Sequence, residues 1–101
     1  MANDQVLMSW QEMESAAKTC DKQSDAIKGI IRNMDGLVQR LDGRWKGDAY
    51  DAFQERWNSD LKKAFQDADD LMMQIAKALR TTSKTYQEVD RAAGQSLRNR
   101  G

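Results

Sequence analysis

The fold of this chain is decided by residues 41–53, which read LDGRWKGDAYDAF. Gly43 and Gly47 flank a tryptophan there, and glycine readily adopts the positive φ angles that a helix end and a tight reversal need. The aspartate after Gly47 is suited to capping a new helix. No proline interrupts the segments on either side, because the chain contains none. The stretch therefore predicts a turn over about residues 42–47, with Trp45 at its corner and a long helix on each side.

Before this turn, apolar residues recur at alternating steps of three and four, which is typical of a helix packed along a seam. The pattern predicts a first helix over about residues 4–41, roughly 55 Å long at 1.5 Å per residue. Ala16, Ile30 and Leu37 widen its apolar face, so we expect this helix to contact two neighbours. The seam runs through Trp10, Met13, Ala17, Cys20, Ser24, Ile27, Ile31, Met34, Val38, Leu41 and Trp45, and all of these except Ser24 are apolar.

After the turn, two apolar lines overlap on a second predicted helix over about residues 48–93. The broad face begins at Phe53 and Trp57. Gly94 is expected to end the helix, which leaves residues 94–101 as a flexible tail. One line comprises Leu61, Phe65, Ala68, Met72, Ile75, Leu79, Thr82, Tyr86 and Val89, and the other comprises Trp57, Leu61, Ala64, Ala68, Leu71, Ile75 and Ala78.

These patterns predict an all-α fold, a single domain over residues 1–101 built as a helix-turn-helix hairpin of two long antiparallel helices. A hairpin has one internal interface, whereas both predicted helices carry faces wide enough for two. We therefore expect a second chain to complete the core and to bury at least about 2,000 Å² in total. The residues expected in the core and dimer seam are Trp10, Met13, Ile27, Ile31, Met34, Val38, Leu41, Phe53, Trp57, Leu61, Phe65, Leu71, Met72, Ile75 and Leu79.

Charge and residue content argue against several classes of protein. Sixteen basic and sixteen acidic residues cancel, whereas a nucleic-acid binder needs a basic face. There is no histidine, and Cys20 lies on the apolar seam, so we predict no catalytic residue, no metal site and no cofactor. Asp67, Asp69 and Asp70 lack the spacing of a calcium loop and are interpreted as a solvated helix face. The chain is not expected to be an enzyme.

Two further signals concern location. No apolar run approaches the length of a membrane span. The N-terminal residues have neither a basic cluster nor an apolar core, so an ordinary secretory signal is not expected.

The turn also carries a family resemblance. Trp45-x-Gly47 has apolar residues at fixed offsets, with Leu41 before it and Ala52 and Phe53 after it. This arrangement, at the centre of a proline-free helical pair of about one hundred residues, resembles the WXG family of small secreted proteins of the early-secretory-antigen type. The resemblance covers essentially the whole chain.

A second element supports the resemblance. Tyr86 and Asp90 are four residues apart and share one face of the second predicted helix. They look like the Tyr-x-x-x-Asp/Glu export motif that this family carries near the end of its second helix. The alternative interpretation is that Tyr86 is simply the next residue of the seam.

The resemblance implies a hairpin that dimerises antiparallel into a four-helix bundle. It also implies a non-enzymatic substrate or helper of the type VII secretion system in Gram-positive bacteria and mycobacteria, with a role in virulence in some members. Such a protein is recognised by a membrane secretion ATPase and moves from the cytoplasm to the cell surface or the medium. The recognition surface would combine the turn of one subunit with the tyrosine-containing end of the other.

Alternatives from other classes remain open. Broad apolar faces also suit a membrane-active amphipathic helix pair, although the polar faces are not rich in lysine. A cytosolic coiled-coil adaptor or chaperone is a third interpretation. The partner is either a second copy, which the zero net charge favours, or a paralogous protein of the same type.

Overall fold

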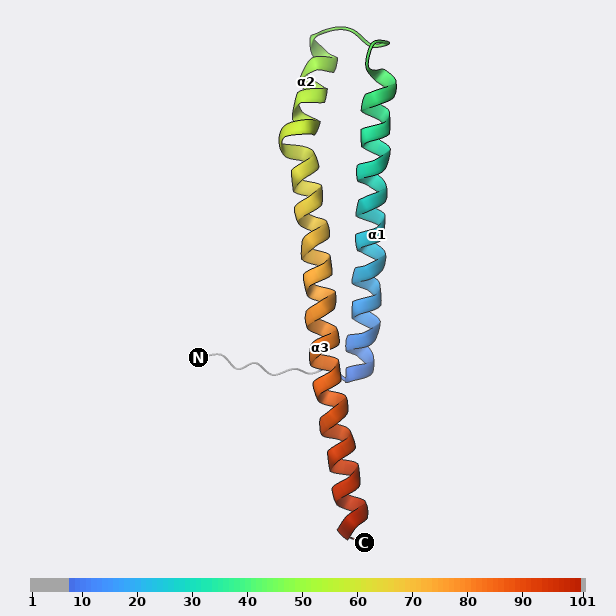
Figure 1. Cartoon of the computed structure of the whole chain (residues 1–101), viewed down its shortest axis with the longest axis vertical. Coiled ribbons are helices and arrows are strands. Elements are labelled where there is room, and N and C mark those ends of the chain that lie inside the picture. Colours follow the sequence, from blue (N-terminus) through green and yellow to red (C-terminus); the bar gives the residue numbers. More distant parts are fainter. Residues whose placement is uncertain (1–7, 101) are drawn as a thin grey trace, which may run out of the picture.

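A computed structural model describes residues 8–100, which form a hairpin of two long helical rods (Figure 1). The first rod is helix α1 (Trp10–Leu41). The second rod comprises α2 (Asp48–Arg56), the π-helical turn η1 (Trp57–Leu61) and α3 (Lys62–Arg100). No strand occurs in the described range. The all-α hairpin predicted from the apolar pattern is confirmed.

Helix α1 begins later than predicted. Ser9 is its N-cap: the Ser9 hydroxyl accepts a hydrogen bond from the Glu12 N–H, and the Glu12 carboxylate accepts one from the Ser9 N–H, both at 3.1 Å. This reciprocal capping box satisfies two N–H groups that would otherwise lack partners and so fixes the first turn. Met8 and Ser9 therefore precede the helix. The predicted start at residue 4 lies outside the described residues.

The reversal occupies residues 42–47, as the two glycines suggested. Gly43 has a φ of +79° and Gly47 a φ of +149°. Residues that carry a Cβ disfavour these backbone conformations. The Trp45 N–H donates to the Leu41 carbonyl at 2.9 Å, which closes the end of α1. Gly47 itself is the N-cap of α2, and no side chain caps that helix. The expected capping aspartate, Asp48, is instead the first helical residue, where its charge favours the helix dipole.

Helix α3 runs on to Arg100, so Gly94 does not end it. One interior glycine weakens a helix by only about 1 kcal/mol. Good helix formers follow Gly94, and no proline stops the chain. At the other end of the hairpin, the Ser83 hydroxyl donates to the Trp10 carbonyl at 3.2 Å, which places the first turn of α1 beside Ser83. The last turns of α3 therefore extend beyond α1 (Figure 1).

The hairpin is one helical layer thick. Its smallest dimension is 14 Å and its longest is 79 Å, while a single helix with side chains measures about 10–12 Å across. Side chains can be buried only along the single line where the two rods meet. The buried residues of α1 are Met13, Ala17, Ser24 and Val38, all on the predicted seam, and those of the second rod are Tyr50, Trp57, Asp69, Ala76 and Ser83.

The π-turn η1 determines which residues of α3 face α1. A π-turn adds one residue to a helix, so the apolar repeat that starts at Trp57 does not continue along the buried side. The line facing α1, here called the inner line, is instead Phe65, Asp69, Met72, Ala76, Leu79, Ser83 and Tyr86. The line that would follow Trp57 in an uninterrupted α-helix lies outside the hairpin. This outer stripe is Leu61, Ala64, Ala68, Leu71, Ile75 and Ala78, and its three large residues are 36%, 52% and 37% exposed.

Candidate interaction surfaces

At the turn, the side chain that closes the hairpin is Tyr50. Its ring is 3% exposed, and its hydroxyl donates to the Val38 carbonyl at 3.1 Å, joining α2 to the last turn of α1. Burial, reinforced by the nearby charges of Asp42 and Asp51, raises the pKa of Tyr50 above its ordinary value, so the phenol stays protonated and continues to donate at neutral pH. Tyr50 was not predicted from the sequence, because the turn motif points to Trp45 and nothing in the apolar pattern marks this tyrosine.

Trp45 rests on Tyr50 and is partly open to solvent. The two ring centroids are 5.5 Å apart at a tilt of 50°, a common geometry for aromatic pairs. Trp45 remains 44% exposed. Together with Gly47 it borders a polar hollow of about 330 Å³ at the apex. The predicted turn motif therefore combines a glycine that shapes the backbone with an indole that is accessible from outside.

Below the turn, Asp35 holds both ends of η1. One carboxylate oxygen accepts a hydrogen bond from Trp57 Nε1 at 2.9 Å, and the other pairs with Lys62 Nζ at 2.9 Å. Trp57 and Lys62 are five residues apart, a spacing that a π-turn brings to the same side of the helix, and the Lys62 N–H donates to the Trp57 carbonyl. The Trp57 hydrogen bond, followed by the Lys62 contact, lowers the pKa of Asp35. Trp57 itself is 1% exposed, so this tryptophan, not Trp45, is the buried one.

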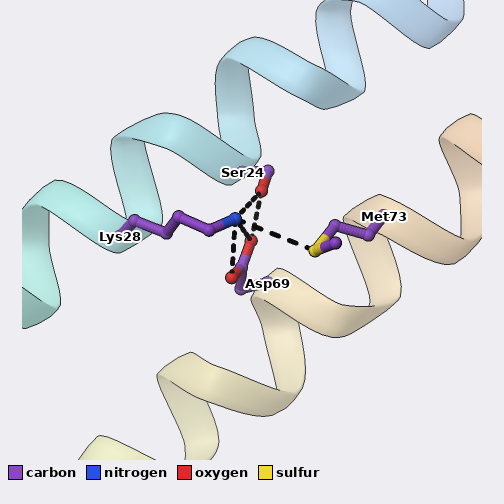
Figure 2. A network of polar contacts seen from close by, with 4 residues as sticks. All are labelled: Ser24, Lys28, Asp69 and Met73. Atoms are coloured by element: carbon purple, nitrogen blue, oxygen red, sulfur yellow. Dashed lines mark hydrogen bonds and ion pairs between the residues drawn. The ribbon is translucent and has the colours of Figure 1, made fainter.

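A polar network crosses the middle of the seam (Figure 2). Ser24 donates to Asp69, and Lys28 Nζ lies 2.7 Å from the Ser24 hydroxyl and 3.0 Å from each Asp69 oxygen. The Ser24 hydrogen bond, followed by Lys28, lowers the pKa of Asp69. The interpretation of Asp69 as part of a solvated face is therefore wrong, because Asp69 is only 8% exposed. One signal was available, since Ser24 is the single polar residue of the predicted α1 seam and requires a polar partner.

At the open end, the predicted export motif lies beside the start of α1. Tyr86, Val89 and Asp90 line a hollow of about 270 Å³ together with Ser9, Trp10 and Gln11. Tyr86 is half-buried and Asp90 is exposed. The lining of the hollow is therefore mainly aromatic and apolar, with the carboxylate of Asp90. Beyond this level α3 continues past the start of α1 (Figure 1).

The two predicted motifs lie at opposite ends of the molecule. Trp45 lies in the turn that joins the rods, whereas Tyr86 and Asp90 lie beside Ser9 and Trp10 at the start of α1. The turn and the start of α1 are at opposite ends of the paired rods (Figure 1). Within one chain they do not meet, so a surface that combines them requires a second chain.

The predicted seam residues divide into three groups. Met13, Val38 and Trp57 are buried between the rods. Trp10, Ile27, Ile31, Met34, Leu41, Phe53, Phe65, Met72 and Leu79 are partly covered, while Leu61, Leu71 and Ile75 lie on the exposed outer stripe. Within residues 8–100, no cluster of acidic or cysteine side chains is suited to a metal ion, and none of the helices is sufficiently long and apolar to cross a bilayer.

Fold and turn together define a class, the helical hairpins with a tryptophan-x-glycine corner. The family described as WXG100, proteins of 100 residues with WXG, matches residues 5–91. The chain therefore belongs to the WXG100 family. A solved structure, EsxA from Geobacillus thermodenitrificans (crystal form I), is similar to it with a TM-score of 0.83 at 19% identity, over 90% of this chain and 99% of that one. No functionally curated protein matches the chain.

Membership of the WXG100 family indicates the general kind of protein this chain is. WXG100 proteins are small, secreted and non-enzymatic substrates of type VII secretion. They typically pair with themselves or with paralogues. The EsxA similarity, at its low identity, extends this only to the fold.

Proposed function

We propose that this chain is a type VII secretion substrate that leaves the cytoplasm as a folded homodimer, with Tyr86 and Asp90 as the residues read by the secretion ATPase. One observation carries the proposal. Tyr86 and Asp90 line the same hollow, beside Trp10, at the point where α3 begins to extend alone. The phenol and the carboxylate are thus accessible together on a rigid helix, which favours recognition by a folded partner.

The first turn of α1 supports this recognition surface. Trp10 and Gln11 form the other wall of the hollow, and the capping box at Ser9 and Glu12 fixes where that wall begins. The Ser83–Trp10 hydrogen bond fixes the level at which α1 meets α3. The hollow is therefore part of the folded hairpin, which is why we propose export of the folded form.

The homodimer is supported by the single-layer shape and by the difference between the two broad faces of that layer. One face carries three ion pairs between the rods, Asp21–Arg80, Lys28–Asp69 and Asp35–Lys62. The other face carries the outer stripe of α3, and Ile30 of α1 is also 41% exposed. An apolar hollow of about 300 Å³ adjoins the stripe at Ile75 and Ala78. Contiguous exposed apolar surface of this kind is typical of an interface.

The export role is tested by comparing secreted with cell-associated protein for Tyr86→Ala and Asp90→Ala. Both variants are expected to accumulate inside the cell. Glu88→Ala is the matched control, because Glu88 is exposed in the same turn but does not line the hollow. Circular dichroism should show that all three variants remain helical. Normal secretion of both motif variants would rule out the export role, and equal loss in the control would rule out its specificity.

The homodimer is tested on the purified full chain by size-exclusion chromatography with light scattering. A mass of twice 11.5 kDa is expected. A stable, folded species of 11.5 kDa would rule out self-association. A dimer that forms only after a paralogous chain is added would replace the homodimer with a heterodimer.

A further inference from the structure

Met73 is the methionine most open to solvent in the part of the chain that the structure describes. It is 53% exposed, whereas Met8 is 38% exposed and Met13 only 1%. Met34 and Met72 are partly covered. A thioether that solvent reaches is open to oxidation to the sulfoxide, a change that methionine sulfoxide reductases reverse. Exposure alone therefore places Met73 among the first methionines that an oxidant would meet.

The Met73 sulfur lies against the polar network that crosses the seam (Figure 2). Lys28 Nζ is 3.7 Å from Met73 Sδ, and the same ammonium contacts the Ser24 hydroxyl and the Asp69 carboxylate. An ammonium has three donors, while a thioether is only a weak acceptor. The hydroxyl and the carboxylate are strong partners, so the donor that points to the sulfur makes the weakest of the three contacts. A stronger acceptor at this sulfur would complete the set.

Met73 remains accessible if the outer stripe of α3 is covered. It follows Asp69 by four residues and so lies next to it on the helix. The Lys28–Asp69 ion pair belongs to the face opposite the outer stripe. The contact between Lys28 and Met73 is also made within one hairpin. An inference about this sulfur is therefore independent of the proposed homodimer and of the proposed export role.

We propose that Met73 is a reversible oxidation site whose sulfoxide is held by Lys28. The oxidant is hydrogen peroxide. A lone pair of the Met73 sulfur attacks one peroxide oxygen, the O–O bond breaks, and the other oxygen leaves as water with the proton of the first. The sulfur is oxidised to the sulfoxide and the peroxide is reduced. An oxygen bonded to the sulfur on the side of Lys28 comes within hydrogen-bond range of Nζ, because the sulfur itself is now 3.7 Å away.

The fold should tolerate oxidation at this position. A sulfoxide is polar, so it disrupts a methionine that packs among apolar side chains, as Met13 does between the rods. At Met73 the new oxygen is instead partly in solvent and faces an ammonium, which makes a charge-assisted hydrogen bond. The oxidised side chain then adds a link between α3 and Lys28 of α1, beside the existing ion pair with Asp69.

Peroxide treatment of the purified full chain tests the site. Peptide mass spectrometry follows the sulfoxide at each methionine over time. Met73 and Met8 are expected to be oxidised first and Met13 last, in the order of their exposure. The two reductases that act on opposite sulfoxide epimers should together restore Met73. A Met73 that stays unmodified after Met8 has been oxidised, or a sulfoxide that neither reductase removes, overturns the site.

A thermodynamic cycle tests the role of Lys28. Urea unfolding is measured before and after oxidation for the unchanged chain and for Lys28→Leu, each with and without Met73→Leu, which subtracts the oxidation of the other methionines. The sulfoxide at position 73 should be less destabilising in the presence of Lys28, by on the order of fivefold in the unfolding constant. This difference is a coupling, so any general loss of stability in Lys28→Leu cancels.

Two further variants separate this contact from general effects of charge. Lys28→Arg keeps a cationic donor and should retain the coupling. Lys22→Leu removes an exposed lysine from the same helix, one that forms no ion pair within residues 8–100, and should retain it as well. If Lys28→Leu does not fold, Lys28→Gln takes its place in the cycle. A sulfoxide whose effect is the same with and without the lysine at position 28 overturns the proposal that Lys28 holds it.

Discussion

The two central tryptophans should contribute very differently to stability. Trp57 is 1% exposed, and its indole N–H is bound by Asp35, whereas Trp45 is 44% exposed on the turn. Replacing each with alanine removes the same atoms. The difference between the two variants therefore reports how much of each ring the fold covers.

The magnitudes follow from the buried area. A tryptophan buries roughly 200 Å² when fully covered. At about 25 cal/mol per Å², near-complete burial of Trp57 is worth about 5 kcal/mol. Trp45 is a little over half covered, which gives about 110 Å² and about 3 kcal/mol. Both values are upper bounds, because the unfolded chain already covers part of each ring. The expected difference is about 2 kcal/mol, with Trp57→Ala the more destabilising.

Urea unfolding followed by circular dichroism measures this difference at one fixed protein concentration, because self-association adds to apparent stability. A loss of about 5 kcal/mol approaches the whole stability of a domain of this size. Trp57→Phe is therefore the companion variant: it keeps an aromatic ring at this position, but removes the N–H that donates to Asp35 together with part of the indole. The reasoning is refuted if Trp45→Ala destabilises the chain as much as Trp57→Ala does, or if Trp57→Phe leaves the unfolding midpoint unchanged.

Two further predictions concern glycines and acid. Gly29→Ala should raise the free energy of unfolding by about 1 kcal/mol, since the nearest atom to the added Cβ is Arg32 Nη2 at 3.9 Å; Gly43→Ala should lower it by about 1 kcal/mol because its φ is +79°, and urea midpoints that move in the same direction would contradict this. The pKa values of Asp35 and Asp69 are lowered in the folded chain, so their stabilisation is fully present above the unfolded value of about 4 and is lost as the pH falls through the lower folded values. The thermal unfolding midpoint should therefore decrease as the pH is lowered past about 4, and it should decrease less steeply in Asp69→Asn. A midpoint that stays constant between pH 6 and pH 3 would count against the network.

The path of the chain followed from the sequence because it depends on local signals. The seam of α1 was visible as a repeat over more than thirty residues, and the two glycines indicated the reversal. The seam of α3 was only partly visible. Two apolar lines one residue apart were both present, and periodicity alone does not choose between them. The choice depends on the π-turn, which is stabilised by Asp35 from the other rod, and no signal within the second helix records that contact.

Polar residues inside the seam were the least predictable part. Asp69 looks like a member of an acidic surface cluster until it is paired with Ser24, forty-five positions away. Ser83 was one polar residue in a weakly helical polar stretch. Each is buried because the opposite rod offers it a partner, and that matching depends on the register of the hairpin. The apolar pattern determines that two rods pack, while these polar pairs determine which sides they present.

The exposure of Trp45 connects stability with export. The fold covers only part of the Trp45 ring, and the buried Tyr50 beside it already joins α2 to α1. The hairpin therefore depends less on Trp45 than on Trp57. If its open face serves recognition, Trp45→Ala should remain helical and dimeric while its secreted fraction falls. Lys46→Ala is the neighbouring control, exposed in the same turn. Secretion of Trp45→Ala at the level of the control would mean that the indole only completes the corner, and that recognition depends on the Tyr86–Asp90 end alone.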